Sequence, residues 1–131
     1  MVRKVILCVD DEKIVLDSLE KQLYNNFGSS FDYEIAENAD DAFEIIDELK
    51  LDGKVIVIIV SDWLMPGIKG DEFLEIVHKK YPDIVKIMLT GQADLEAIEN
   101  AKKNANLFKC IYKPWSEEEL VETVREGVKK L

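Results

Sequence analysis

Val55-Ile56-Val57-Ile58-Ile59-Val60 is a run of six β-branched apolar residues, and Ser61 and Asp62 follow it directly. A run of this kind predicts a strand that is buried on both faces, as the central strands of parallel sheets are. Pro66 and Gly67 come soon afterwards and predict a loop. Because the functional groups of open α/β sheets gather outside the carboxyl ends of the strands, we expect Asp62 to lie at a functional edge.

Four more apolar runs predict strands over residues 5–9, 31–36, 84–89 and 107–112. A segment with apolar residues at helical spacing follows each of the five strands. Strands that alternate with single helices predict an α/β fold, in which right-handed crossovers join parallel strands and helices cover both faces of the sheet. The run over residues 31–36 is the weakest and fits an edge strand. The sequence has no segment with the composition of a linker, so we expect one domain over residues 1–131.

The ends of the helices can be predicted in part from capping residues. Asn38 is expected to cap the second helix and Asp71 the third, because their side chains can accept a hydrogen bond from a free backbone N–H group. The fourth helix, over residues 93–103, has only a thin apolar stripe, which begins at Leu95. The last helix is expected to bury a face that ends at Leu131.

Charge and composition restrict the class of protein. The formal net charge of −10 disfavours direct binding to nucleic acid or to an anionic membrane surface. The longest apolar run, over residues 55–60, is far too short to span a membrane. Cys8 and Cys110 each lie within an apolar run, which indicates buried free thiols in a reducing compartment. We therefore expect a cytoplasmic protein.

Polar or charged side chains stand where four of the predicted strands end. Asp10 and Asp11 follow the first strand, Asp62 the third, Thr90 the fourth and Lys113 the fifth. In a parallel sheet, the carboxyl ends of all strands meet at the same edge. Five residues that are distant in the sequence are therefore expected to lie close together.

This set of side chains is suited to phosphoryl transfer. Three neighbouring carboxylates repel one another, and Lys113 can offset only one of the charges. Mg²⁺ prefers oxygen ligands and commonly binds to one or two carboxylates together with phosphate oxygens. An aspartate such as Asp62 can act as a nucleophile toward phosphorus. Mg²⁺, the Lys113 ammonium and the Thr90 hydroxyl would then each offset charge on the phosphoryl oxygens.

The same residues resemble the receiver domain of two-component response regulators, the CheY-like family. The motifs that carry the resemblance are Asp10-Asp11, Ser61-Asp62 with Met65-Pro66-Gly67 behind it, Thr90-Gly91 and Lys113-Pro114. They occur in the family's order and cover essentially the whole chain. The resemblance implies a flavodoxin-like (βα)5 three-layer sandwich, with a five-stranded parallel sheet in the order 2-1-3-4-5. It also implies that a partner histidine kinase or phosphotransfer protein phosphorylates Asp62.

The resemblance further assigns ligands at the site. It implies that Asp10, Asp11 and Asp62 bind Mg²⁺, with the backbone carbonyl of Trp63 as a further ligand. Lys113 would pair with the phosphoryl group, and the Lys113-Pro114 peptide would be cis, a form that proline makes accessible.

A switch follows from the same resemblance. Thr90 would move toward the phosphoryl oxygens, and Tyr112 would turn inward behind it, which changes the surface of the last two helices and the strand between them. A homodimer could form through the surface of these two helices. Simpler roles compete with these assignments, because Asp11 could cap a helix, Thr90 could bond its own backbone and Tyr112 could be a packing residue.

Two further side chains are expected to affect hydrolysis of the phosphorylated protein, and the only histidine is expected to have no role. We expect Leu64 to shield the acyl phosphate from water and Gln92 to orient the attacking water. His78 lies on a polar helix face without a visible partner, so it is assigned no part in phosphotransfer.

Two other functions compete with the receiver. A Mg²⁺-dependent phosphatase with an aspartyl nucleophile would usually place that nucleophile after the first strand, with a second Asp two residues later. Position 12 is Glu instead, which counts against this alternative. A nucleotide-binding or FMN-binding module would need a glycine-rich loop that the sequence lacks. The chain is expected to be either a stand-alone receiver or the N-terminal part of a longer protein with an unidentified output domain or effector.

Overall fold

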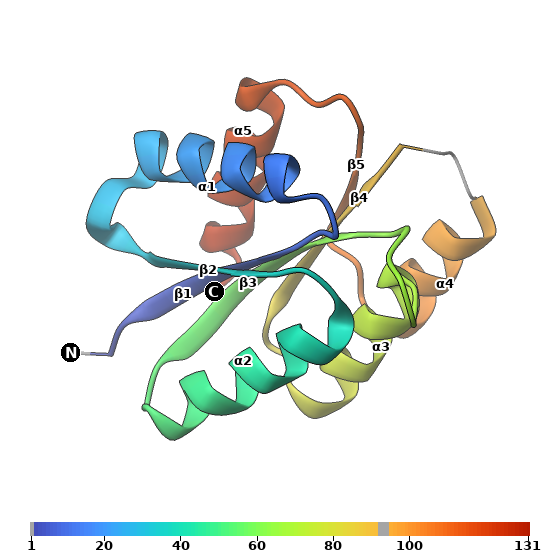
Figure 1. The fold of residues 1–131 in the computed structure, drawn as a ribbon, viewed down its shortest axis with the longest axis horizontal. Helices are drawn as coiled ribbons and strands as arrows, with labels where there is room; N and C mark the ends of the chain where they lie inside the picture. The colour runs from blue at the N-terminus through green and yellow to red at the C-terminus, as the bar shows by residue number, and fades with distance from the viewer. Residues whose placement is uncertain (1, 92–94) are drawn as a thin grey trace.

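Strands and helices alternate along the chain in the computed structural model, which describes residues 2–91 and 95–131 (Figure 1). The strands are β1 (Lys4–Val9), β2 (Asp32–Ala36), β3 (Val55–Asp62), β4 (Val85–Thr90) and β5 (Lys109–Tyr112). The helices are α1 (Lys13–Phe27), α2 (Ala39–Leu51), α3 (Gly70–Lys80), α4 (Leu95–Asn104) and α5 (Glu117–Lys129), with a short 3-10 turn at Gly28–Ser30. All five predicted strands are therefore present, and the beginning of the predicted fourth helix falls outside the described residues.

The five strands form one parallel sheet in the order β2-β1-β3-β4-β5. Helices α1 and α5 cover one face of this sheet, and α2, α3 and α4 cover the other (Figure 1). The flavodoxin-like three-layer sandwich is thereby confirmed. The weakly apolar β2 is an edge strand, as its sequence predicted, and β3 is the middle strand.

Each face of the sheet has its own hydrophobic core. On one face, Ile58 of β3 belongs to a buried cluster with Leu19 of α1 and Val124 of α5. On the other face, Ile59 belongs to a cluster with Phe73 of α3. Neighbouring residues of β3 point to opposite faces, so a continuous apolar run is what a strand between two helical layers requires.

Burial decreases toward the ends of several elements, and here some expectations were wrong. The side chain of Val55 is 48% exposed, because β3 begins beyond the helices that cover its later residues. Leu131 is 53% exposed and Leu95 is 70% exposed, so neither joins a buried helix face. Apolar spacing identifies the face of a helix that points inward, but it does not show how far the neighbouring layer extends.

Capping was predicted correctly for one of the two helices. The Asn38 side chain accepts a hydrogen bond from the backbone N–H of Asp41 at 2.8 Å, which caps α2. Helix α3 instead begins at Gly70, with Lys69 at the N-cap position, so Asp71 lies within the first turn and does not cap the helix. Its carboxylate has other partners, which are described below.

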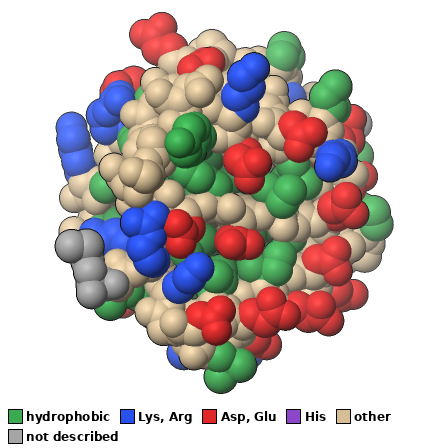
Figure 2. Space-filling view, turned by 60° about the vertical axis from the view of Figure 1, so that its left-hand side comes forward, with side chains coloured by type: hydrophobic (Ala, Val, Ile, Leu, Met, Phe, Trp, Pro, Cys, Tyr) green, Lys and Arg blue, Asp and Glu red, His purple; other side chains and the backbone are tan. Residues whose placement is uncertain are grey.

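Acidic side chains are prominent on the surface. Figure 2 shows them along the right and lower parts of one face, in keeping with the net charge of −10. Among the described residues, no helix has the length and apolar character that crossing a membrane would require. Cys8 is buried and Cys110 is half-buried, and both are free thiols. Burial raises the pKa of Cys8 to about 12.

Lys86 of β4 is a cation inside the core. Its side chain is fully buried, and its Nζ lies 2.9 Å from Nδ1 of His78 on α3. The expectation that His78 has no partner was therefore wrong. Because an ammonium can only donate, Nδ1 of His78 must be the acceptor, which places the imidazole proton on Nε2. No carboxylate among the described residues is within ion-pair distance of Lys86, and burial lowers its pKa to about 8.

We expect Lys86→Met to stabilise the fold by about 1–2 kcal/mol at pH 7, because it removes a buried cation that has no anionic partner among the described residues. Between the folded pKa of about 8 and the ordinary value of 10.5, the unfolded state binds more protons, so wild-type stability gains from this group as pH rises. The advantage of the variant should therefore shrink from pH 7 to pH 10 in urea unfolding experiments.

Lys109→Met is the matched control, since Lys109 is an exposed lysine on the adjacent strand β5. A stability difference between wild type and Lys86→Met that stays constant with pH would contradict the expected burial of the charge.

Candidate functional site

The carboxyl ends of four strands meet at one edge of the sheet and bring the predicted residues together. Asp10 and Asp11 directly follow β1, and Asp62 is the last residue of β3. Thr90 ends β4, and Lys113 follows β5. The strand registers set these ends at similar heights, because Asp62 pairs with Leu89 across the β3–β4 ladder and Thr90 pairs with Tyr112 across the next.

Three carboxylates form the acidic part of this site. One oxygen from each of Asp10, Asp11 and Asp62 lies within 4.8 Å of the other two. Asp10 and Asp62 are buried, and Asp11 is exposed. The cluster is thus closed on the side of the sheet and open to solvent at Asp11. Three oxygen donors at this separation could hold one hard divalent cation.

Lys113 lies between the two buried carboxylates. Its Nζ is 2.9 Å from Asp10 Oδ2 and 3.2 Å from Asp62 Oδ1. Removing one partner from a buried ion pair of this kind typically costs about 3–5 kcal/mol, because a charge is then left without compensation. The ammonium therefore stabilises an edge that would otherwise carry only negative charge.

The pKa values at the site reflect this balance. Burial, and then the negative charge of Asp10, raise the pKa of Asp62 to about 6, although Lys113 opposes both effects. Burial alone would lower the pKa of Lys113, but the hydrogen bond to Asp10 and the charge of Asp62 outweigh it, so this pKa is raised. One ammonium thus does not neutralise the cluster.

The start of α1 fixes Asp10. Its Oδ1 accepts a hydrogen bond from the backbone N–H of Glu12 at 2.9 Å, while Oδ2 accepts from Lys113. Glu12 occupies the N-cap position of α1. Asp11 therefore does not cap this helix, and its exposed carboxylate is left at the mouth of the cluster.

Backbone contacts hold the loop after β3 close to Asp62. The N–H of Trp63 donates to the carbonyl of Leu89 at 2.8 Å, and the carbonyl of Trp63 accepts from the N–H of Gly70 at 2.7 Å. Gly70 is buried, and a Cβ atom there would collide with the backbone oxygen of Asp62 and lie 2.8 Å from the Cα of Trp63. Only glycine allows α3 to begin this close to Asp62. Sequence analysis did not identify Gly70, and its position at the start of α3 was the available signal.

The expected switch residues lie on neighbouring strands. Thr90 is buried, whereas Tyr112 is 49% exposed, so its ring is directed outward here. The backbone N–H of Lys113 donates to the carbonyl of Thr90 at 2.8 Å, and the Lys113-Pro114 peptide is cis, as the resemblance implied.

The remaining predicted residues have different surroundings. Leu64 is 49% exposed, two positions after Asp62, and Gln92 lies outside the described residues. Trp115, for which no role was predicted, packs against the core beneath α1 and α5, and its Nε1 donates to Oε1 of Gln22 at 2.8 Å. Trp63 instead donates from Nε1 to Asp71 at 3.0 Å, a contact that sequence analysis did not predict.

Comparison with known proteins gives consistent results. The family model of the response regulator receiver domain matches residues 6–125. The chain is 33% identical over 123 residues to the hydrogenase transcriptional regulatory protein HoxA of Cupriavidus necator, which covers 94% of this chain and 24% of that protein. The chain thus spans about a quarter of the length of this curated relative.

Solved structures with the same fold are also similar. A CheY-like response regulator receiver domain protein from Methanospirillum hungatei is 30% identical, with a TM-score of 0.81 and coverage of 99% of this chain and 97% of that one. The signal receiver domain of an HD domain-containing protein from Pseudomonas fluorescens is 26% identical, with a TM-score of 0.85 and coverage of 97% and 95%.

We expect Gly70→Ala to destabilise the fold by about 1–3 kcal/mol, because the added methyl group must displace the backbone of Asp62 and Trp63. Urea unfolding of the wild type and the variant measures this loss. Gly91→Ala is the matched control, since no atom of the described residues 2–91 and 95–131 lies within 4 Å of the Cβ it would add. Equal effects of the two substitutions would show that the close approach at Gly70 is not what matters.

Proposed function

This chain belongs to the response regulator receiver domain family, and on that premise we propose that it is a phosphorylation switch of a two-component system. Asp62 is the phosphoacceptor, and a partner histidine kinase or phosphotransfer protein is the donor. The observation that supports this assignment is the position of Asp62, which ends the central strand beside Lys113 in a cluster that opens to solvent.

The transfer step follows from ordinary nucleophilic chemistry. A carboxylate oxygen of Asp62 forms a bond to phosphorus while the bond from phosphorus to the donor nitrogen breaks, and the imidazole leaves. A carboxyl group with a pKa of about 6 is still mostly ionised at pH 7, so burial does not prevent Asp62 from attacking. Receiver domains are signalling domains, and we propose that this one carries out only transfer to itself and slow hydrolysis.

The donor atoms at the site fit Mg²⁺. Asp10, Asp11 and Asp62 would hold it through carboxylate oxygens. The carbonyl of Trp63, which also accepts from the N–H of Gly70, would be the further ligand that the resemblance implies. All of these donors are oxygen atoms, and three carboxylates with one ammonium leave an excess of negative charge. When bound, Mg²⁺ neutralises charge on the phosphoryl oxygens.

Lys113 and Thr90 respond to the new charge. After transfer, the Lys113 ammonium pairs with a phosphoryl oxygen, and the Thr90 hydroxyl donates to another. Tyr112, which is outward in the present structure, turns inward when Thr90 moves. Thr90 and Tyr112 are thus the switch residues of the proposal.

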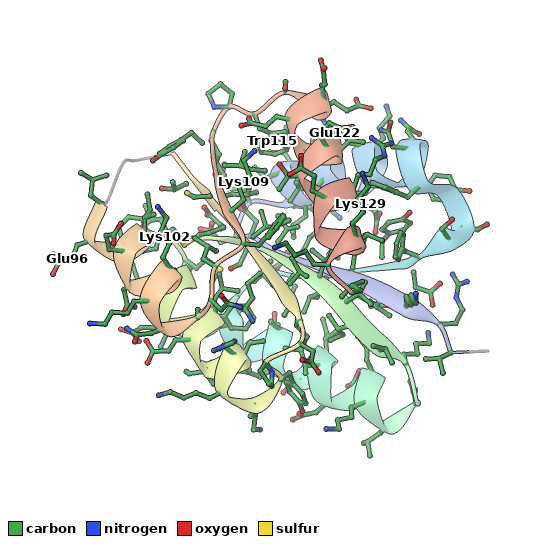
Figure 3. All side chains as sticks on the ribbon, turned by 180° about the vertical axis from the view of Figure 1, so that it is seen from behind. Glu96, Lys102, Lys109, Trp115, Glu122 and Lys129 are labelled. Carbon is green, nitrogen blue, oxygen red and sulfur yellow. The ribbon has the colours of Figure 1, made fainter. Side chains whose placement is uncertain are left out.

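The affected surface is formed by α4, β5 and α5. Figure 3 shows Glu96 and Lys102 on α4 and Lys109 on β5. These exposed charges of both signs suit a contact with a second copy or an effector. We propose that the unidentified output reads this surface, that residues 1–131 act as one receiver domain, and that the domain meets its kinase in the cytoplasm.

We expect acetyl phosphate with Mg²⁺ to add one phosphoryl group to the protein, because a small phosphodonor can replace the kinase once the site holds the metal. Intact mass spectrometry measures the addition. Asp62→Asn should abolish it, and chelation of Mg²⁺ should prevent it.

Asp52→Asn is the matched control, since Asp52 is an exposed aspartate after α2. Labelling of Asp62→Asn to the wild-type extent would refute the assignment of Asp62. Turnover of many phosphate monoesters per protein would support the phosphatase alternative, which no similarity described above favours.

We expect Leu64→Ala to shorten the lifetime of the phosphorylated protein, since the Leu64 side chain would no longer shield the acyl phosphate from water. Loss of the phosphoryl group can be followed by intact mass after the donor is removed. Leu51→Ala is the control, because Leu51 is an exposed leucine at the end of α2. A dephosphorylation rate equal to that of the wild type would exclude shielding by Leu64.

A further inference from the structure

A cavity lies at the amino ends of the strands, on the edge of the sheet opposite the acidic cluster. It is bounded by the first residues of β3, by the C-terminal ends of α2 and α3, and by the loop between α3 and β4. Its volume is about 360 Å³, within the range of roughly 300–1,000 Å³ that pockets for small molecules have. Val57 in its wall is separated from Asp62 by roughly 16 Å along β3. The cavity is therefore distinct from the proposed phosphorylation site.

Unequal strand lengths explain why the cavity forms here. β3 begins at Val55, but its ladder with β4 begins only where Ile58 pairs with Val85. The first three residues of β3 therefore have no part of β4 beside them. On their other side they lie next to β1, and the N–H of Val55 donates to the carbonyl of Arg3 at 3.0 Å. This wall is thus held by the sheet, and a ligand would meet it already formed.

Apolar side chains make up most of the lining. Ile46 of α2 and Ile84 before β4 belong to the hydrophobic core on the α2 side of the sheet, and Ile56 packs against that core. Val55 and Leu131, whose exposure the sequence did not predict, also line the cavity. An aliphatic chain placed here would remove apolar surface of both side chains from water.

The charged groups around the cavity are mainly positive, in contrast to the net charge of −10 of the whole chain. Lys50, Lys54 and Lys80 contribute ammonium groups, and Asp83 is the one carboxylate among the described lining residues. Lys54 pairs with Asp32 at 3.4 Å. No carboxylate of the described residues is within ion-pair distance of Lys50 or Lys80. Both of these lysines are exposed, so their charges are available at the rim.

Two features limit the charge of a suitable ligand. Lys50 and Lys80 lie in the last turns of α2 and α3, where the partial negative charge of a helix end offsets part of each ammonium charge. The site therefore suits one anionic group better than a multiply charged one. The Nζ of Lys50 lies 4.6 Å from the ring centre of Tyr81, a contact that keeps this ammonium beside the cavity.

We propose that this cavity binds a small aliphatic carboxylate, with its chain against the apolar lining and its carboxylate between Lys50 and Lys80. The lining favours an aliphatic chain, and the excess of ammonium groups at the rim favours an anionic head group. Neither argument uses Asp62 or a bound metal, so the inference is independent of the proposed function.

The test is a titration of the isotope-labelled whole chain with octanoate, followed by NMR. Octanoate should shift the amide signals of residues 46–57 and 80–84 in one saturable process. Affinity should rise about fourfold for each methylene group added from hexanoate to octanoate, because each added group becomes buried. Octan-1-ol, which has the same chain without the charge, should bind about 3–10-fold more weakly.

The head-group contact is tested by Lys50→Gln/Lys80→Gln. This variant should bind octanoate about 3–10-fold more weakly than the wild type and octan-1-ol within about twofold of it. Lys21→Gln/Lys103→Gln is the matched control, since it removes two exposed lysines that do not line the cavity and changes the net charge equally. It should leave the affinity for octanoate within about twofold of the wild type.

The location of the chain is tested by Val55→Trp, which places a large ring at the cavity from a half-exposed position. Saturable binding of both octanoate and octan-1-ol should be lost, while urea unfolding shows that the variant remains folded. Leu51→Trp is the control, because Leu51 is 88% exposed and does not line the cavity. It should bind both ligands as the wild type does.

Three results would overturn the proposal. The first is the absence of saturable shifts with octanoate in the wild type. The second is equal weakening of octanoate binding by the two pairs of lysine substitutions, which would show a general effect of net charge. The third is unchanged binding in folded Val55→Trp, which would place the ligand elsewhere. None of them bears on phosphorylation of Asp62, which is measured separately with acetyl phosphate.

Discussion

The Lys113 ammonium between Asp10 and Asp62 is the contact on which the acidic edge depends. Parallel strands end side by side, so this topology concentrates whatever side chains follow them. Here it places two buried carboxylates and one exposed carboxylate together. A single bridging lysine makes the arrangement tolerable without removing its excess negative charge. The edge is therefore stable enough to fold and still attractive to a cation.

The sheet and the site could be predicted from the sequence because both depend on short-range patterns. A β-branched run such as residues 55–60 specifies a strand between two layers, and a polar residue at its end specifies the edge. Asp10, Asp11, Asp62, Thr90 and Lys113 could be assigned to one edge without knowing any distance. The family resemblance added the order of the strands, which alternation alone does not determine.

What could not be predicted depends on contacts between elements. Asp71 is of a residue type that often caps helices, but its carboxylate accepts hydrogen bonds from Trp63 and Asn100 instead. Lys86 and His78 belong to a strand and a helix whose relative position no local pattern reveals. Leu131 and Val55 are apolar residues, but their side chains are exposed at the ends of their segments. In each case the outcome was decided by which neighbour the packed layers supply.

The bond between Lys113 and Asp10 joins positions 103 residues apart, and this separation bears on how the domain matures during synthesis. The ribosome delivers all three carboxylates of the cluster before it delivers their counter-charge. Strand β5 is also an outer strand of the sheet and the last strand in the chain, so the final strand and the neutralising lysine are synthesised together. A nascent chain that stops before β5 retains an unbalanced acidic rim. The site can therefore be complete only after β5 and Lys113 have been synthesised.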